Sequence, residues 1–146
     1  MNVDKRFETE IVKKYRENIQ KKKVSLFLKL FFDKVLALLL LIPLSPIIVG
    51  IAIWIKLDSE GPVFFRQERI TQYGKSFRIY KFRTMVQNAE QLGAQVTSKG
   101  DMRVTSVGQA LRKCRLDELP QLINILEGTM SFVGTRPEVP RYVAAY

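Results

Sequence analysis

The longest uninterrupted run of apolar residues lies in the first half of the chain, from Val35 to Ile55, and contains no charged residue. As an α-helix, its roughly 21 residues would extend about 30 Å, which is the thickness of the hydrocarbon core of a bilayer. That length exceeds the usual buried helix of a soluble protein, so the pattern predicts a membrane segment. The run begins too late, and is too long, for a secretory signal peptide.

Two prolines, Pro43 and Pro46, lie in the middle of this run with Ser45 between them. Each interior proline removes a backbone hydrogen bond, and the Ser45 hydroxyl can bond back to a carbonyl near Leu41 and bend the helix further. Cations flank both ends of the run, so the positive-inside rule gives a single crossing no orientation. These features favour a re-entrant helix, broken at Ser45 and Pro46, that returns to the side it entered. A kinked single crossing is the alternative.

The residues before the membrane segment are polar and basic. Phe7, Ile11, Tyr15 and Ile19 recur at every fourth position. This spacing predicts an amphipathic helix that lies on the membrane or on a partner, and a solvated extension is the alternative.

From Ser59 onward the pattern is that of a globular domain that opens with a turn signal at Gly61-Pro62. Two strands and two short helices are predicted there: Val63–Ile70, Ser76–Met85, Val86–Gln95 and Val107–Cys114. The chain therefore divides into a basic extension (1–28), a re-entrant membrane helix (29–58) and a globular domain (59–146). The predicted fold class is α+β and mostly helical: a small monotopic membrane protein whose cytoplasmic domain contains a short β-hairpin.

A further helix is predicted to begin at Asp117, which is placed to act as its N-cap. The acidic pair Asp117-Glu118 follows three cations, one of which is Arg112, and Pro120 falls in the first turn. A helix N-terminus favours negative charge, so carboxylates flanked by arginines suit the joint binding of a metal ion and a phosphate. The alternative is a capped surface helix with an ordinary acidic first turn.

Two further groups of residues are candidates for phosphate binding. Alternation along the second strand places Lys81 and Arg83 on one face, about 7 Å apart, where they could grip a diphosphate. The loop Gly134–Pro140 is stiffened by Pro137 and holds Arg136 in a narrow set of positions, which suits a phosphate or a nucleotide. A solvated strand edge and a plain surface loop are the respective alternatives.

The composition limits which side chains could act as a catalytic base or bind a metal ion. The chain has 146 residues, a net charge of +10 and no histidine, so neither an imidazole base nor a histidine-bound metal is available within it. Any metal would be a hard, oxygen-bound ion such as Mg²⁺. The single cysteine, Cys114, excludes an internal disulfide. The positive charge suits an anionic membrane surface, and the apolar run and the lack of a recognition motif argue against nucleic acid.

Together these segments resemble the bacterial sugar transferases, the small monotopic polyprenyl-phosphate phosphoglycosyl transferases. The resemblance covers about Lys29 to Tyr142 and is specific because six segments occur in order. They are Lys29–Asp33 (KLFFD), Leu44–Pro46 (LSP), Gly61–Arg69 (GPVFFRQER), Phe77–Met85 (FRIYKFRTM), Leu116–Leu122 (LDELPQL) and Met130–Glu138 (MSFVGTRPE).

The resemblance implies a function. Asp117 would be the nucleophile that attacks the β-phosphate of a UDP-sugar and forms a phosphosugar–aspartyl intermediate, with Glu118 helping to hold Mg²⁺. Polyprenyl (undecaprenyl) phosphate would then accept the sugar phosphate. Arg112 would bind phosphate, Arg136 would bind the nucleotide, and Ser45-Pro46 would make the helix re-entrant.

The resemblance also implies a cellular location and a biosynthetic role. Such enzymes act at the cytoplasmic face of the bacterial inner membrane and initiate exopolysaccharide, capsule, O-antigen or glycoprotein glycan synthesis. A homo-oligomer or partner glycosyltransferases are in keeping with that setting.

Two departures from the family pattern stand out. Thr135 occupies a position where the family usually has proline, and the chain ends at Tyr146, whereas relatives continue with a Pro-Gly-Ile-Thr-Gly motif. These departures suggest a C-terminally truncated member, for which an inactive membrane-bound homologue that binds nucleotide sugar or lipid without turnover is the alternative function.

Overall fold

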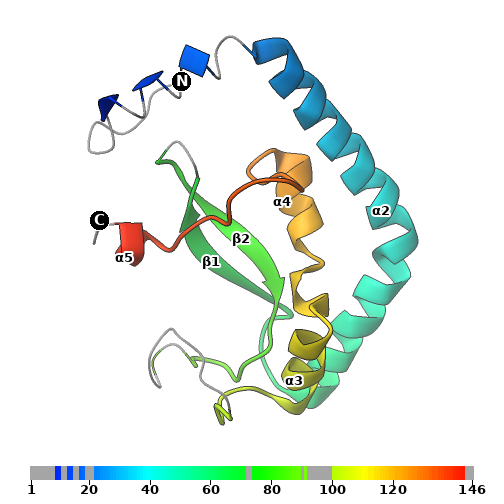
Figure 1. Cartoon of the computed structure of the whole chain (residues 1–146). Coiled ribbons are helices and arrows are strands. Elements are labelled where there is room, and N and C mark those ends of the chain that lie inside the picture. Colours follow the sequence, from blue (N-terminus) through cyan, green and yellow to red (C-terminus); the bar gives the residue numbers. More distant parts are fainter. Residues whose placement is uncertain are drawn as a thin grey trace. The chain divides into compact units, whose positions relative to one another are not determined.

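The computed structural model describes residues 9–10, 13–14, 17–18, 22–71, 74–89, 91 and 100–143. Its elements in chain order are listed here with their bounds (Figure 1): α2 (Lys23–Asp58), β1 (Phe64–Ile70), β2 (Ser76–Phe82), α3 (Ser106–Lys113), the 3₁₀-helix η2 (Leu116–Glu118), α4 (Gln121–Glu127) and α5 (Pro140–Val143). Strands β1 and β2 form a two-stranded antiparallel sheet, which confirms the predicted mixture of helices with a short hairpin.

The chain divides into two compact units, which are described separately. Unit 1 contains Met1–Leu40, Gln67–Ile79 and Leu122–Tyr146. Unit 2 contains Leu41–Arg66 and Tyr80–Gln121.

Helix α2 carries the apolar run and remains helical for 36 residues, through both prolines. It is long and apolar enough to cross a membrane, and only 11% of its most apolar window is buried within the protein. So much exposed apolar surface is unusual for the core helix of a soluble domain. The helix begins at Lys23, earlier than predicted, and the re-entrant path stays a prediction.

A side-chain hydrogen bond stabilises the helix at Pro46. In a regular helix the carbonyl of Ile42 would accept from the N–H four residues later, and Pro46 has no N–H. The Ser45 hydroxyl donates to this carbonyl instead, at 2.7 Å. The bond lies one residue from the carbonyl expected from the sequence, and it satisfies a polar group that lipid could not.

The predicted N-terminal amphipathic helix is only partly described. Glu10, Lys13, Lys14, Glu17 and Asn18 are helical. The four apolar positions on which the prediction rests, Phe7, Ile11, Tyr15 and Ile19, lie outside the described residues.

In unit 2 the hydrophobic core joins the end of α2 to β2 and α3. Ile51 and Ile55, one turn apart on α2, pack with Phe82, Val107 and Leu111, and all five side chains are buried. This cluster anchors the segment that follows α3, because Leu116 and Leu119 pack against it. The acidic pair therefore lies on a short turn with an apolar residue on either side that holds it to the core.

Local structure after β2 differs from the prediction. The strand ends at Phe82 rather than Met85, which forms only an isolated bridge with Val104. The predicted helix Val86–Gln95 is wrong over its described residues: 87–89 and 91 form turns, and Val86 has no regular structure. Asn88 has a positive φ of 61°, a conformation that a helix does not contain. The helix predicted over Val107–Cys114 is confirmed as α3.

The prediction that Asp117 caps a helix is also wrong. Asp117 lies inside η2, which the chain enters through Arg115 in a left-handed conformation with φ of 58°, and α4 begins only at Gln121. The physical reason is Pro120, which cannot donate to the carbonyl of Leu116. Leu119 donates to that carbonyl instead, at 3.2 Å, so the turn closes with 3₁₀ geometry.

In unit 1 a polar cluster ties α2 to the segment after α4. The Ser131 hydroxyl donates to Asp33 Oδ2 at 2.6 Å, and Lys29 Nζ donates to Asp33, to Ser131 and, at 3.0 Å, to the carbonyl of Val133. Asp33 is buried, so its charge is compensated by the lysine and the hydroxyl together.

Candidate functional site

The acidic pair forms the centre of the candidate site, in unit 2. Asp117 is only 9% exposed, and among the described residues nothing donates a hydrogen bond to its Oδ1. Glu118 differs, because its Oε1 accepts from Lys81 Nζ at 3.0 Å. One carboxylate is thus engaged by a cation, and the other has a buried oxygen without a hydrogen-bond partner among the described residues.

The environment raises the pKa of Asp117 above its ordinary value. The main cause is burial, which disfavours the charged carboxylate. The charge of Lys81 opposes this rise, that of Glu118 adds to it, and that of Arg112 opposes it weakly. The four side chains therefore share one electrostatic environment.

Arg112 is held by a buried threonine. Its Nε donates to Thr84 Oγ1 at 2.8 Å, and Thr84 is only 7% exposed. Within the described ranges, no hydrogen-bond partner is found for either terminal nitrogen of Arg112. The sequence interpretation identified this arginine but not the threonine, whose only signal was its place in the segment Phe77–Met85.

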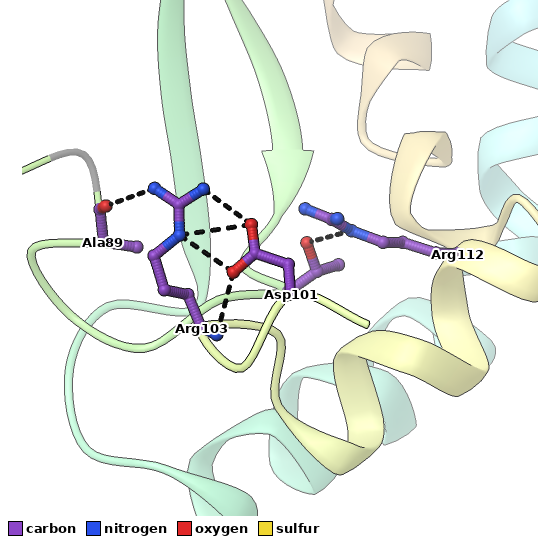
Figure 2. A network of polar contacts seen from close by, with 5 residues as sticks. Ala89, Asp101, Arg103 and Arg112 are labelled. Atoms are coloured by element: carbon purple, nitrogen blue, oxygen red, sulfur yellow. Dashed lines mark hydrogen bonds and ion pairs between the residues drawn. The ribbon is translucent and has the colours of Figure 1, made fainter. Parts of the chain in front are cut away.

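Asp101 lies between Arg103 and Arg112 in the view of Figure 2 and is bonded by Arg103. Arg103 Nη2 lies 2.6 Å from Asp101 Oδ2, and its Nε lies 2.9 Å from Oδ1. These hydrogen bonds lower the pKa of Asp101 to about 2. Arg103 Nη1 also donates to the carbonyl of Ala89 at 2.9 Å, so the pair fixes the turn that contains Ala89.

The two cations predicted to grip a diphosphate together have different surroundings. Lys81 reaches Glu118, whereas Arg83 is 6% exposed and its Nη2 donates to the carbonyl and hydroxyl of Ser59, at 2.6 and 2.8 Å. Nε and Nη1 of Arg83 are buried with no partner among the described residues. Gly61 lies beside them with φ of 115°, which side-chain-bearing residues rarely adopt, and a Cβ there would lie 2.4 Å from Nη1.

Arg136 and Pro137, the remaining predicted binding residues, belong to unit 1. Arg136 is exposed, and the next residues are fixed to β1. Arg69 Nη1 donates to the carbonyl of Pro137 at 3.1 Å, and the Ile70 N–H donates to that of Glu138 at 2.9 Å. The loop is therefore anchored directly after its arginine. Ser45 and Pro46 lie exposed on α2, and the roles of all these residues stay predictions.

Mg²⁺ is compatible with the acidic pair. The part of the chain that the structure describes has no group of three or more acidic, cysteine or histidine side chains that could enclose a metal ion. Mg²⁺ is commonly held by one or two carboxylates together with substrate phosphates and water. Asp117 and Glu118 supply such a pair of carboxylates, and carboxylate oxygens are ligands of the kind that Mg²⁺ prefers.

Comparison with known proteins gives a consistent result. The family model described as bacterial sugar transferase matches residues 24–146. The chain is 52% identical over 118 residues to the UDP-N-acetylgalactosamine-undecaprenyl-phosphate N-acetylgalactosaminephosphotransferase of Aeromonas hydrophila, which covers 80% of this chain and 28% of that protein. It is 46% identical over 124 residues to the UDP-glucose:undecaprenyl-phosphate glucose-1-phosphate transferase of Escherichia coli (strain K12), covering 84% and 26%.

The lengths of these relatives differ. The chain spans about a quarter of the two proteins above. It is 38% identical over 146 residues to a Bacillus subtilis (strain 168) protein, and there it covers 81% of the relative.

Proposed function

Because this chain belongs to the bacterial sugar transferase family, we propose that it transfers a sugar 1-phosphate from a UDP-sugar to undecaprenyl phosphate. The names of the two relatives above state these two substrate classes. The observation that carries the proposal to particular residues is the buried Asp117, with one unbonded carboxylate oxygen beside the Lys81–Glu118 ion pair.

In the first step the free oxygen of Asp117 attacks the phosphorus that bears the sugar. The bond from this phosphorus to the oxygen bridging the two phosphates breaks, and UMP leaves with that oxygen. Burial destabilises the Asp117 carboxylate, and forming an acyl phosphate removes its charge, so the environment that raises its pKa favours attack. The product is a phosphosugar–aspartyl intermediate.

In the second step an oxygen of undecaprenyl phosphate attacks the same phosphorus. The acyl–phosphate bond breaks, Asp117 regains its carboxylate, and the lipid diphosphate sugar is released. No proton has to move in either step, which fits a site without histidine. The lipid-linked sugar would be the first unit of a cell-surface polysaccharide.

Cations of the site stabilise the phosphate charge that both steps carry. Arg112 offers two terminal nitrogens, which match two oxygens of one phosphate. Lys81, which pairs with Glu118, contributes a point charge beside the carboxylates. Preorganised charge of this kind is generally the largest contribution to phosphoryl transfer.

A Mg²⁺ ion held by Asp117 and Glu118 would neutralise part of the diphosphate charge. Oδ1 of Asp117, which has no hydrogen-bond partner among the described residues, would be the attacking atom, and the other oxygen of Asp117 would hold the metal. Glu118 would remain oriented by Lys81, whose Nζ lies 3.0 Å from Oε1.

In a direct test, the protein is placed in vesicles that contain undecaprenyl phosphate. A panel of UDP-sugars is then added together with Mg²⁺. UMP release that requires the lipid acceptor, and a lipid diphosphate sugar identified by mass spectrometry, are the expected results. Binding of UDP-sugars without UMP release from any member of the panel would overturn the proposed reaction.

We further propose that α2 is re-entrant and that both of its ends face the cytoplasm. Support comes from its two central prolines and from cations at both ends. Cys114 is exposed, so it is first replaced by serine, and single cysteines are then placed at Ser25 and Lys56. An impermeant thiol reagent should label neither position in intact cells and both after permeabilisation. Labelling of one position alone in intact cells would instead establish a crossing helix.

A further inference from the structure

We infer that Thr84 is a positioning residue for the reaction: its hydroxyl fixes the Arg112 guanidinium in the orientation that receives a substrate phosphate. This inference rests on the proposed function, in which Arg112 binds the donor. It adds a residue that is not itself placed against the substrate.

The backbone of Thr84 is fixed against α3. Its carbonyl accepts from the Thr105 N–H at 3.1 Å, directly before the helix. Gly108 lies so close that a Cβ there would be 2.1 Å from this carbonyl oxygen. A side chain at Gly108 would therefore push the helix away, and glycine allows α3 to pack directly on Thr84.

The same packing brings Arg112 to the threonine hydroxyl. Gly108 and Arg112 are four residues apart on α3, so they lie one turn apart on the same face. The start of this helix is fixed as well, because the Thr105 hydroxyl accepts from the Gly108 N–H at 3.0 Å. The Nε–Oγ1 distance of 2.8 Å between Arg112 and Thr84 thus follows from a rigid register rather than from a flexible surface contact.

The bond to Thr84 uses Nε of Arg112, and this choice of nitrogen affects how the arginine can bind phosphate. A guanidinium that donates through Nε has its plane fixed by that bond, and its two terminal nitrogens remain to form the parallel pair of bonds that phosphate accepts. An arginine that is already ordered loses less rotamer freedom when the ligand binds. The Thr84 hydroxyl therefore increases affinity for the donor without touching it.

Asp101 does not orient the Arg112 guanidinium. Arg112 slightly lowers the pKa of Asp101, so the two charges interact, but both oxygens of Asp101 are bonded by Arg103 (Figure 2). The carboxylate therefore attracts Arg112 electrostatically, while the hydrogen bond that orients the arginine comes from Thr84.

Two matched pairs of side chains test the inference in the full chain, with UMP release as the assay. Thr84→Val keeps the shape of wild-type threonine and loses its hydroxyl, and Thr84→Ala differs from Thr84→Ser only in the hydroxyl. The variants without a hydroxyl should raise KM for the UDP-sugar about tenfold, the effect of one hydrogen bond to a charged group. Thr84→Ser should stay within about threefold of wild type, and kcat should change less than KM. If Thr84→Val does not fold, the comparison of Thr84→Ala with Thr84→Ser tests the role of the hydroxyl instead.

A double-mutant comparison distinguishes the positioning role of Thr84 from a purely structural one. In an Arg112→Ala background, Thr84→Val or Thr84→Ala should change KM by less than about twofold, because the residue they position is gone. Equal effects in both backgrounds, or wild-type KM in both hydroxyl-free variants, would overturn the inference.

Failure of the proposed function gives a different result. If the wild-type chain neither binds UDP-sugars nor releases UMP, or if Arg112→Ala leaves KM unchanged, the premise falls and the inference falls with it. If Arg112→Ala raises KM and the Thr84 variants do not, only the role of Thr84 is overturned.

Discussion

Asp101 and Asp117 are aspartates of the same compact unit, both within the field of Arg112, and their pKa values are shifted in opposite directions. Asp101 has both oxygens bonded by Arg103, and its pKa is lowered to about 2. Asp117 is buried with an unbonded oxygen, and its pKa is raised. A carboxylate with all its hydrogen bonds made stabilises a loop, whereas one that is desolvated and incompletely bonded is available for chemistry.

The two shifts have opposite consequences for stability. The folded state binds a proton at Asp117 more tightly than the unfolded chain does, so this group's contribution to stability falls as pH rises from 3.8 through the raised pKa. Asp101 contributes stability that is fully present above its ordinary value of 3.8 and is lost as pH falls toward about 2. At neutral pH one aspartate therefore supports the fold and the other opposes it.

The largest expected effect comes from Asp117→Asn, which keeps the shape and removes the nucleophile. UMP release should fall at least about a thousandfold. The melting temperature at pH 7 should stay level or rise, because a destabilising buried charge is gone. Activity and thermal unfolding are measured on the same preparation. A residual rate of a tenth of wild type or more would show that Asp117 is not the nucleophile.

Lys81→Gln tests the cause of the Asp117 environment. Lys81 supplies the largest influence that lowers the pKa of Asp117, so its loss should raise that pKa further and move the acid limb of the pH–rate profile to higher pH. The rate at pH 7 should fall about tenfold or more, since a charge-assisted contact is lost as well. Lys81→Arg keeps the charge and serves as the control. An unmoved acid limb in Lys81→Gln would contradict the assignment.

Asp101→Asn should lower the melting temperature and leave the rate of UMP release nearly unchanged, the reverse of Asp117→Asn. We expect a melting temperature lower by a few degrees at pH 7, because Arg103 loses its charged partner, and a rate within about fivefold of wild type below that temperature. The difference in melting temperature from wild type should shrink as pH falls below 3.8, where wild-type Asp101 also begins to lose its charge. A thousandfold loss of rate would show that Asp101 takes part in the chemistry.

The contrast between these aspartates could not be predicted from the sequence. Composition and periodicity identified the long apolar helix, the hairpin, α3 and the acidic pair, because each depends on local pattern. The 3₁₀ turn at Asp117 depends on a hydrogen bond that Pro120 cannot make and on the left-handed Arg115. The bonds from Arg83 to Ser59 depend on how the segment after α2 packs, and the bond from Arg112 to Thr84 depends on how α3 packs; residue spacing encodes neither.

The smallest effect that we predict concerns the cation that the two aspartates share. Arg112 is the weakest of the influences that lower each pKa. Arg112→Gln should therefore raise the pKa of both aspartates, and at Asp117 by less than Lys81→Gln does. Carboxyl ¹³C chemical shifts of labelled aspartate, followed against pH in detergent micelles, give both values in one titration. Arg112→Lys, which keeps a positive charge, should leave both nearly unchanged. A shift at only one aspartate in Arg112→Gln would mean that the two acids do not share this field and that their environments are independent.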